Sequence, residues 1–123
     1  MRVVHESGGD RRVLATAVER ADTLRSQVLG LRFRDALPEG HAMVIDAPDS
    51  PFPLVGSPSS ATVDMLGVSF PLDVVWVADG RVRQTKRLRP WLGLGIARAD
   101  TIVELPAGVA EDVAVGDRLA IEE

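Results

Sequence analysis

The chain has 123 residues, of which 46% are hydrophobic and 26% are charged, and its formal net charge is −4. This length and composition predict one folded globular domain, residues 1–123, rather than a disordered chain. The absence of cysteine excludes disulfides, thiol nucleophiles and thiolate metal sites, and two histidines 36 positions apart argue against a histidine-based metal site. We expect no metal and no cofactor.

The sequence also lacks the usual signals of membrane insertion and export. No apolar run approaches the roughly 18 residues needed to cross a bilayer. The first residues, Met1 to Glu6, lack the apolar core of a signal peptide. We therefore expect no transmembrane segment and a cytoplasmic location.

The first predicted elements are a strand and a helix. Apolar and polar residues mix between Arg12 and Arg20 in a pattern that favours a strand. A short helix follows, with Asp22 or Thr23 as its N-cap and Gly30 ending or kinking it. Its apolar residues recur at three- and four-residue spacing: Leu24, Val28, Leu29 and Leu31.

Two short strands are predicted on either side of a long loop. Ala42 to Ile45 is an apolar run of strand length. Residues 46–60 contain four prolines, so no ladder of backbone hydrogen bonds is expected there. Thr62 to Leu66 alternates, with Val63 and Met65 on one face.

The strongest local signal is Asp79-Gly80, a dipeptide typical of a two-residue hairpin turn between two β-rich runs. With such a turn, Val77 faces Val82, and Trp76 faces Arg83. Val75, Val77 and Val82 then form the core face. Trp76 is expected on the other face beside Arg81 and Arg83, where guanidinium groups can stack on its indole.

The remainder alternates loops with strands. We predict a loop over Arg89–Ile96, a strand over Thr101–Leu105, a single helical turn over Val109–Val115 and a last strand over Arg118–Ile121. Strand signals every ten to fifteen residues, with one early helix, indicate a mainly β fold. The predicted architecture is a compact single-domain β sandwich or barrel with one short helix.

Positive charge is concentrated in one window. Arg81 to Arg98 holds six basic residues and no acidic one, which leaves a charge of −10 on the rest of the chain. Such a window attracts anions. The candidate ligand-binding residues are Trp76, Arg81, Arg83, Arg87, Arg89 and Trp91. The apolar residues that follow, Leu92, Leu94 and Ile96, either suit an amphipathic ligand or partner, or fold back to cap the barrel.

Carboxylates provide the alternative chemistry. Asp64, Asp73 and Glu104 lie in apolar strand contexts, and pairs of carboxylates cleave glycosidic bonds. The sequence does not determine the distances between these three carboxylates, and we predict no catalytic residue. Asp73 shares strand parity with Val75 and Val77, so we expect it buried and held structurally by backbone amides or by a nearby Arg or Thr. Both histidines are expected at the surface.

Several motifs, in order and spacing, resemble the domain of unknown function 192 family, also called uncharacterised protein family 0127. They include Gly30-Leu31-Arg32, Met65, Pro71-Leu72-Asp73 and Glu104-Leu105-Pro106-Ala107-Gly108. The resemblance covers about residues 12–121 and implies a mainly β fold with one short helix, without implying a reaction. It marks these structural motif residues: Gly30, Met65, Pro71, Asp73, Glu104, Pro106 and Gly108. Members commonly have Met-Lys-Asn-Thr where this chain has Met65-Leu66-Gly67-Val68.

The sequence therefore predicts a non-catalytic binding module for a small polar or anionic ligand. Two other classes stay open: a carboxylate-based hydrolase, and a domain that binds a protein or nucleic acid. The overall acidity argues against nucleic acid, because phosphate contacts need many cations.

Overall fold

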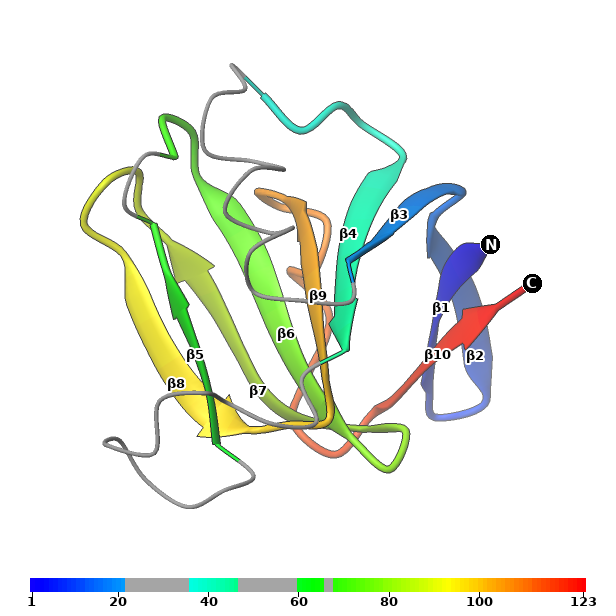
Figure 1. The fold of residues 1–123 in the computed structure, drawn as a ribbon. Helices are drawn as coiled ribbons and strands as arrows, with labels where there is room; N and C mark the ends of the chain where they lie inside the picture. Colours follow the sequence, from blue (N-terminus) through cyan, green and yellow to red (C-terminus); the bar gives the residue numbers. More distant parts are fainter. Residues whose placement is uncertain (22–35, 47–59, 66–67) are drawn as a thin grey trace.

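The computed structural model describes residues 1–21, 36–46, 60–65 and 68–123. The described chain consists of strands, turns and loops (Figure 1). The strands are β1 Arg2–Ser7, β2 Asp10–Ala15, β3 Ala17–Ala21, β4 His41–Asp46, β5 Ser60–Asp64, β6 Leu72–Ala78, β7 Arg81–Leu88, β8 Leu94–Arg98, β9 Thr101–Pro106 and β10 Arg118–Glu122. The prediction of a mainly β domain is confirmed.

Eight strands form one sheet in the order β2-β1-β10-β7-β6-β9-β4-β3. Its two edge strands, β2 and β3, are consecutive in sequence, and only Thr16 separates them. One extended segment therefore pairs with β1 through its first half and with β4 through its second half. The amides of Thr16 and Ala17 both donate to Gly40 O at the bend. The sheet thus closes on itself as a barrel.

The barrel interior is filled by side chains from every strand of this sheet. Valine, leucine and alanine dominate it. The buried members are Val3, Leu14, Ala15, Ala42, Val44, Val75, Val77, Val82, Val103, Leu105, Ala110, Val113 and Leu119, with Val18 of β3 packed against them. Strand alternation places these residues on the inner face. β10 meets β7 at only one residue pair, and Ala110 and Val113 supply core side chains from the segment between β9 and β10.

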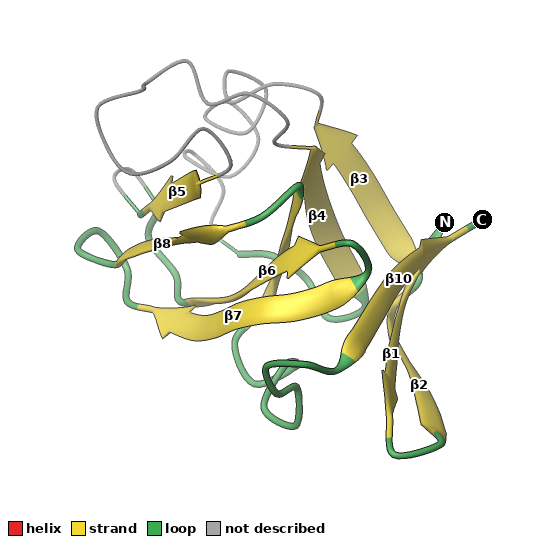
Figure 2. Cartoon of the chain, turned by 90° about the horizontal axis from the view of Figure 1, so that it is seen from below, coloured by secondary structure: helices red, strands yellow, loops and turns green. Residues whose placement is uncertain are grey.

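A second apolar core lies on the outer face of β6, β9 and β4. It contains Met43, Ile45, Leu72, Val74, Trp76 and Ile102, together with Val63 and Met65 at β5. A two-stranded sheet of β5 and β8 contributes to this layer. Figure 2 shows that small sheet on the opposite side of the molecule from β1 and β2. β6 is therefore buried on both faces.

The Asp79-Gly80 hairpin is confirmed. Both turn residues have positive φ, 53° and 74°, as the two-residue turn with right-handed strand twist requires. Val77 faces Val82 and both are buried, as predicted. The register shifts next, so that Trp76 faces Gln84 and Arg83 has no opposite residue on β6. The predicted pairing of Trp76 with Arg83 was wrong, because a β-bulge inserts one residue into β7.

Other boundaries also differ from the predictions. The Arg12–Arg20 strand is two strands that bend at Thr16. β8 begins at Leu94, inside the predicted Arg89–Ile96 loop. Residues 109–115 form successive turns instead of a helical turn, since three of their hydrogen bonds span three residues each. The predicted helix with Gly30 and most of the proline-rich loop lie outside the described residues. Of the described residues, none belongs to a helix that could cross a membrane.

Gly95 of β8 is where the small sheet packs most closely on the barrel. A Cβ atom added there would lie 2.8 Å from Trp76 Cζ2 and closer still to Cη2, which is nearer than side chains tolerate. We expect Gly95→Ala to lower the free energy of unfolding by about 1–3 kcal/mol. Urea denaturation measures this. Trp76→Phe removes both of these indole atoms. In a chain that carries Trp76→Phe, Gly95→Ala should therefore lower the free energy of unfolding by clearly less. An equal cost in both backgrounds would show that Trp76 does not make the contact.

Candidate functional site

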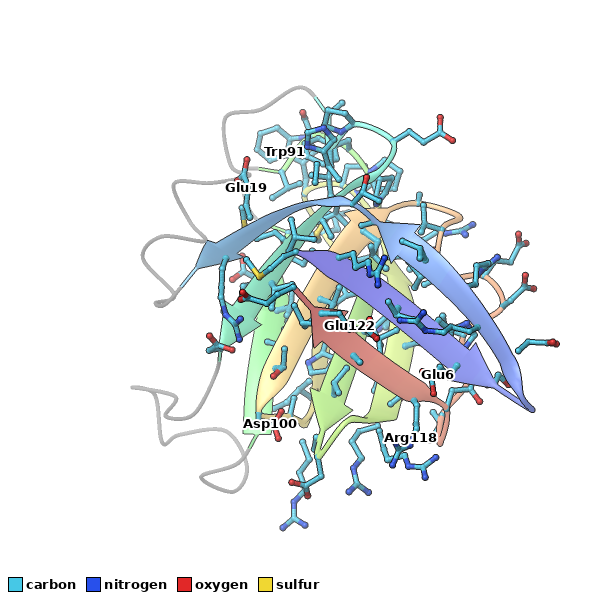
Figure 3. All side chains as sticks on the ribbon, turned by 90° about the vertical axis from the view of Figure 1, so that its right-hand side faces the viewer. Glu6, Glu19, Trp91, Asp100, Arg118 and Glu122 are labelled. Atoms are coloured by element: carbon cyan, nitrogen blue, oxygen red, sulfur yellow. The ribbon has the colours of Figure 1, made fainter. Side chains whose placement is uncertain are left out.

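The structure divides the predicted ligand-binding residues into two groups. Arg81 and Arg83 begin β7, whereas Arg87 and Arg89 lie at its other end. Arg87 lies six positions after Arg81 along the strand, about 20 Å of extended chain. Arg81 pairs with Arg118, and Figure 3 shows Arg118 and Trp91 at opposite ends of the molecule. These residues do not form one pocket.

Trp76 joins neither group. Its side chain is fully buried in the outer core, beneath Gly95. The sequence placed it correctly on the face opposite Val75 and Val77. It did not reveal that the β5–β8 sheet covers that face. Ligand contact at Trp76 would require that layer to move.

Two of the predicted cations have structural partners. Arg81 Nη1 donates to Gly116 O at 3.2 Å. Arg87 Nε donates to Asp73 Oδ1 at 2.9 Å, and this hydrogen bond raises the pKa of Arg87 above its ordinary value. Among the described residues, the Arg87–Asp73 pair is the one ion pair of the 81–98 window. Arg83 and Arg89 are exposed.

Asp73 is a structural acceptor, as predicted. Its residue is 4% exposed, and Oδ2 accepts hydrogen bonds from the Gly108 amide at 2.9 Å and the Ala110 amide at 3.0 Å. Leu72 faces Pro106 in the same part of the β6–β9 ladder. The Pro-Leu-Asp and Glu-Leu-Pro-Ala-Gly motifs therefore meet in space. Asp73 holds the segment that fills the gap between β7 and β10.

The three carboxylates of the hydrolase hypothesis face different directions. Asp73 lies on the inner side of the barrel sheet. Glu104 is 1% exposed and faces Val74 and Met43 in the outer core. Asp64 is exposed on the far side of β5 from Val63. Within the described part of the chain, no group of three or more His, Asp or Glu residues could hold a metal ion. The remaining motif residues are Met65, which is buried, and Pro71, which is exposed before β6.

The turn between β7 and β8, together with β8 itself, carries four exposed large hydrophobic side chains. Trp91 is 56% exposed, Leu92 77% and Leu94 58%, and Ile96 follows at 41%. The sequence left two interpretations of this loop open. Exposure toward a ligand or partner therefore describes these side chains better than capping of the barrel does. We call these four residues, with Lys86 and Arg89, the turn surface.

The turn surface is held rigidly. The Trp91 amide donates to Val68 O, the Gly93 amide to Arg89 O and the Met65 amide to Gly93 O, each at 3.0 Å. Trp91 has a φ of 64°, which is rare for a bulky residue and costs about 1–3 kcal/mol. Lys86 Nζ donates to Leu94 O at 2.9 Å, which places a cation beside β8. The backbone of Trp91 is therefore strained, while its indole is exposed to solvent.

A second polar cluster was missed by sequence reasoning. His5 is 6% exposed instead of lying at the surface, and its Nε2 is 2.8 Å from Asp117 Oδ2. The hydrogen bond from His5, followed by one from the Ala114 amide, lowers the pKa of Asp117 below its usual range. This pair joins β1 to the residue before β10. The two residues are 112 positions apart, so no local pattern could have indicated the contact.

The DUF192 family model, described as "Uncharacterized ACR", matches residues 3–121. The comparison with curated proteins found no match. A crystal structure of a protein of unknown function from Novosphingobium aromaticivorans is similar, with a TM-score of 0.76, 25% identity, and coverage of 98% of this chain and 84% of that one. A protein of Sinorhizobium meliloti described as a candidate transcription regulator has a TM-score of 0.77 and 24% identity, with coverage of 97% and 91%. The latter likeness shows the fold alone.

Removal of the Asp73 charge tests its structural role. Asp73→Asn replaces one acceptor oxygen by an NH2 group, which must face either Arg87 or the two backbone amides. We expect a loss of about 1–3 kcal/mol in the free energy of unfolding. Arg87→Gln should cost less, under about 1 kcal/mol, because the Arg87 side chain is 53% exposed and water can replace it. Thermal and urea unfolding curves provide the measurement. An unchanged curve for Asp73→Asn would contradict the structural role.

The His5–Asp117 pair predicts a dependence of stability on pH. Because the folded-state pKa of Asp117 is lowered, its stabilisation is present above the unfolded-state pKa of about 3.9 and is lost as the pH falls through the folded-state pKa. The difference in unfolding free energy between the native chain and Asp117→Asn should therefore shrink below about pH 4. Asp112→Asn is the control, since its side chain is 78% exposed. A difference independent of pH would contradict the assigned role of Asp117.

Proposed function

Because the chain belongs to the DUF192 family, whose description names no reaction, we propose its function from the geometry of its surface: a non-catalytic module that binds a small anionic ligand at the turn surface. The observation that carries this proposal is the combination of Arg89 and Lys86 with a strained, exposed Trp91. More than half of the Trp91 surface stays in solvent. A ligand would gain both charge and a flat apolar surface.

The electrostatic pattern supports an anion. The 81–98 window contains no acidic residue, although the chain is acidic as a whole. A local positive field on an acidic protein favours an anion at that place and discourages anions elsewhere. Of the predicted ligand residues, Arg89 and Trp91 keep their proposed role. Arg81 and Arg87 already serve backbone and carboxylate partners.

The arrangement supports binding over catalysis. Asp73 has no free carboxylate oxygen for a catalytic site, since Arg87 and two backbone amides donate hydrogen bonds to both of its oxygens. Asp64 is exposed on β5 of the small sheet, whereas Glu104 is buried on β9 of the barrel sheet. A paired-carboxylate mechanism needs two such groups about 5–10 Å apart that flank the scissile bond. Of the three carboxylates of the hydrolase hypothesis, Asp73 is fully engaged, Glu104 is buried and Asp64 is exposed.

Inorganic phosphate is the simplest probe of this proposal. We expect titration at constant ionic strength to shift the amide resonances of Arg89, Trp91, Leu92 and Gly93 and the Trp91 indole resonance, as charge-assisted hydrogen bonds form. Arg89→Gln should raise the apparent Kd by about threefold or more, which is a loss of about 0.7 kcal/mol in binding free energy.

The matched control is Arg118→Gln, which removes the same charge from an exposed arginine at the other end of the molecule. It should leave the titration of the turn resonances unchanged. Equal effects of the two substitutions would show that phosphate binding reflects general electrostatics and not a site at the turn. An absence of shifts at the turn would refute the proposed anion site.

A further inference from the structure

We propose that the turn surface docks this protein on an anionic lipid surface, with Trp91 and Leu92 entering the headgroup region and Lys86 and Arg89 contacting lipid phosphates. This inference rests on the proposed function, since it identifies the bound anion as the phosphate of a lipid headgroup. It adds a role for the apolar side chains that a free anion would not use.

The apolar half of the turn surface is unlike the rest of the described molecule. Four large hydrophobic side chains are exposed within six residues, from Trp91 to Ile96. The other exposed large hydrophobics of the described chain, Met1, Val13 and Val115, are single residues at separate places in the sequence. Single exposed hydrophobics are normal, whereas a contiguous group marks an interaction surface.

The residue types suit an interface between water and lipid. An indole has an apolar body and a polar N–H, and it prefers the headgroup depth of a bilayer. Leu92 is the most exposed large hydrophobic residue of the described chain, at 77%, and follows Trp91 directly. Backbone hydrogen bonds to Val68 and Met65 hold the turn, so docking would cost little ordering of the chain.

Charge favours an anionic surface. Lys86 lies beside Leu94, Arg89 begins the turn, and Arg98 ends β8 on the same face as Leu94 and Ile96. Among the described residues, Asp64 faces Leu94 and is an acidic neighbour on that face. The cations outnumber it, so the positive charges would meet lipid phosphates while the acidic remainder of the protein stays in solvent.

The position of the turn also favours a broad surface over an enclosed site. Figure 1 shows the connection between β7 and β8 at the margin of the molecule, on the side away from both termini. Its apolar side chains are exposed. An exposed apolar turn with cations beside it can enter a headgroup layer without any change in the barrel.

Vesicle co-sedimentation tests the proposal with the full chain. We expect the protein to bind vesicles made of equal parts phosphatidylcholine and phosphatidylglycerol, and to stay in the supernatant with phosphatidylcholine alone. Leu92→Glu should weaken binding by about tenfold or more, because it puts a charge into the headgroup layer. The pair Lys86→Gln and Arg89→Gln should weaken it similarly and remove its salt dependence.

Two matched controls distinguish effects that are specific to the turn surface from general effects of a changed charge. Val115→Glu makes the same kind of change at a side chain that is 63% exposed and far from the turn in sequence. Arg83→Gln with Arg118→Gln removes two exposed positive charges, one near the opposite end of β7 and one at the start of β10. Each control should change vesicle affinity by less than about twofold. Circular dichroism of every variant confirms that it folds.

The outcomes are distinct. Equal losses in the controls and the turn variants, or no binding to either vesicle, would overturn the lipid proposal. If phosphate still shifts the turn resonances while vesicles do not bind, the lipid inference fails and the anion site stands. If neither probe binds, both fail. A dimer that light scattering detects and that Leu92→Glu dissociates would overturn the lipid proposal in favour of a second copy of this chain.

Discussion

Burial of β6 on both faces is the constraint on which the rest of the structure depends. Every residue from Leu72 to Val77 is buried, so one strand serves two cores. Val75 and Val77 require a closed barrel on one side, while Val74 and Trp76 require a second layer on the other. Desolvating the Asp73 carboxylate at the start of this strand is tolerable only because Arg87 and the Gly108 and Ala110 amides satisfy it.

The proposed surface follows from this two-layer arrangement. β7 belongs to the barrel and β8 to the outer sheet, so the intervening turn carries the chain from one layer to the other. Gly95 lets β8 lie directly on the Trp76 indole, which orients Leu94 and Ile96 outward. Apolar side chains at this crossing have no core to enter. Their exposure is a consequence of the packing, and Trp91 adds a residue with positive φ to this exposed turn.

Local patterns predicted the elements whose determinants are local. Asp79-Gly80 indicated the hairpin, strand parity placed Asp73 on the core side, and Ala42–Ile45 indicated β4. Gly8-Gly9, which joins β1 to β2 with positive φ at both residues, is an equally good turn signal that went unused. The burial of Trp76 and the contact of His5 with Asp117 depend on segments distant in sequence. The basic window was visible in the sequence, but its division between the two ends of β7 appears only in the structure.

Trp91 and Trp76 make the central claim measurable, because one indole is exposed and the other fully buried. Phosphatidylglycerol vesicles whose acyl chains carry bromine quench only an indole that approaches the lipid interior. We expect such vesicles to quench the native protein and to leave the Trp91→Phe protein, whose fluorescence comes from Trp76, unquenched. Equal quenching of the two proteins, or no quenching of the native protein, would contradict a lipid-facing turn.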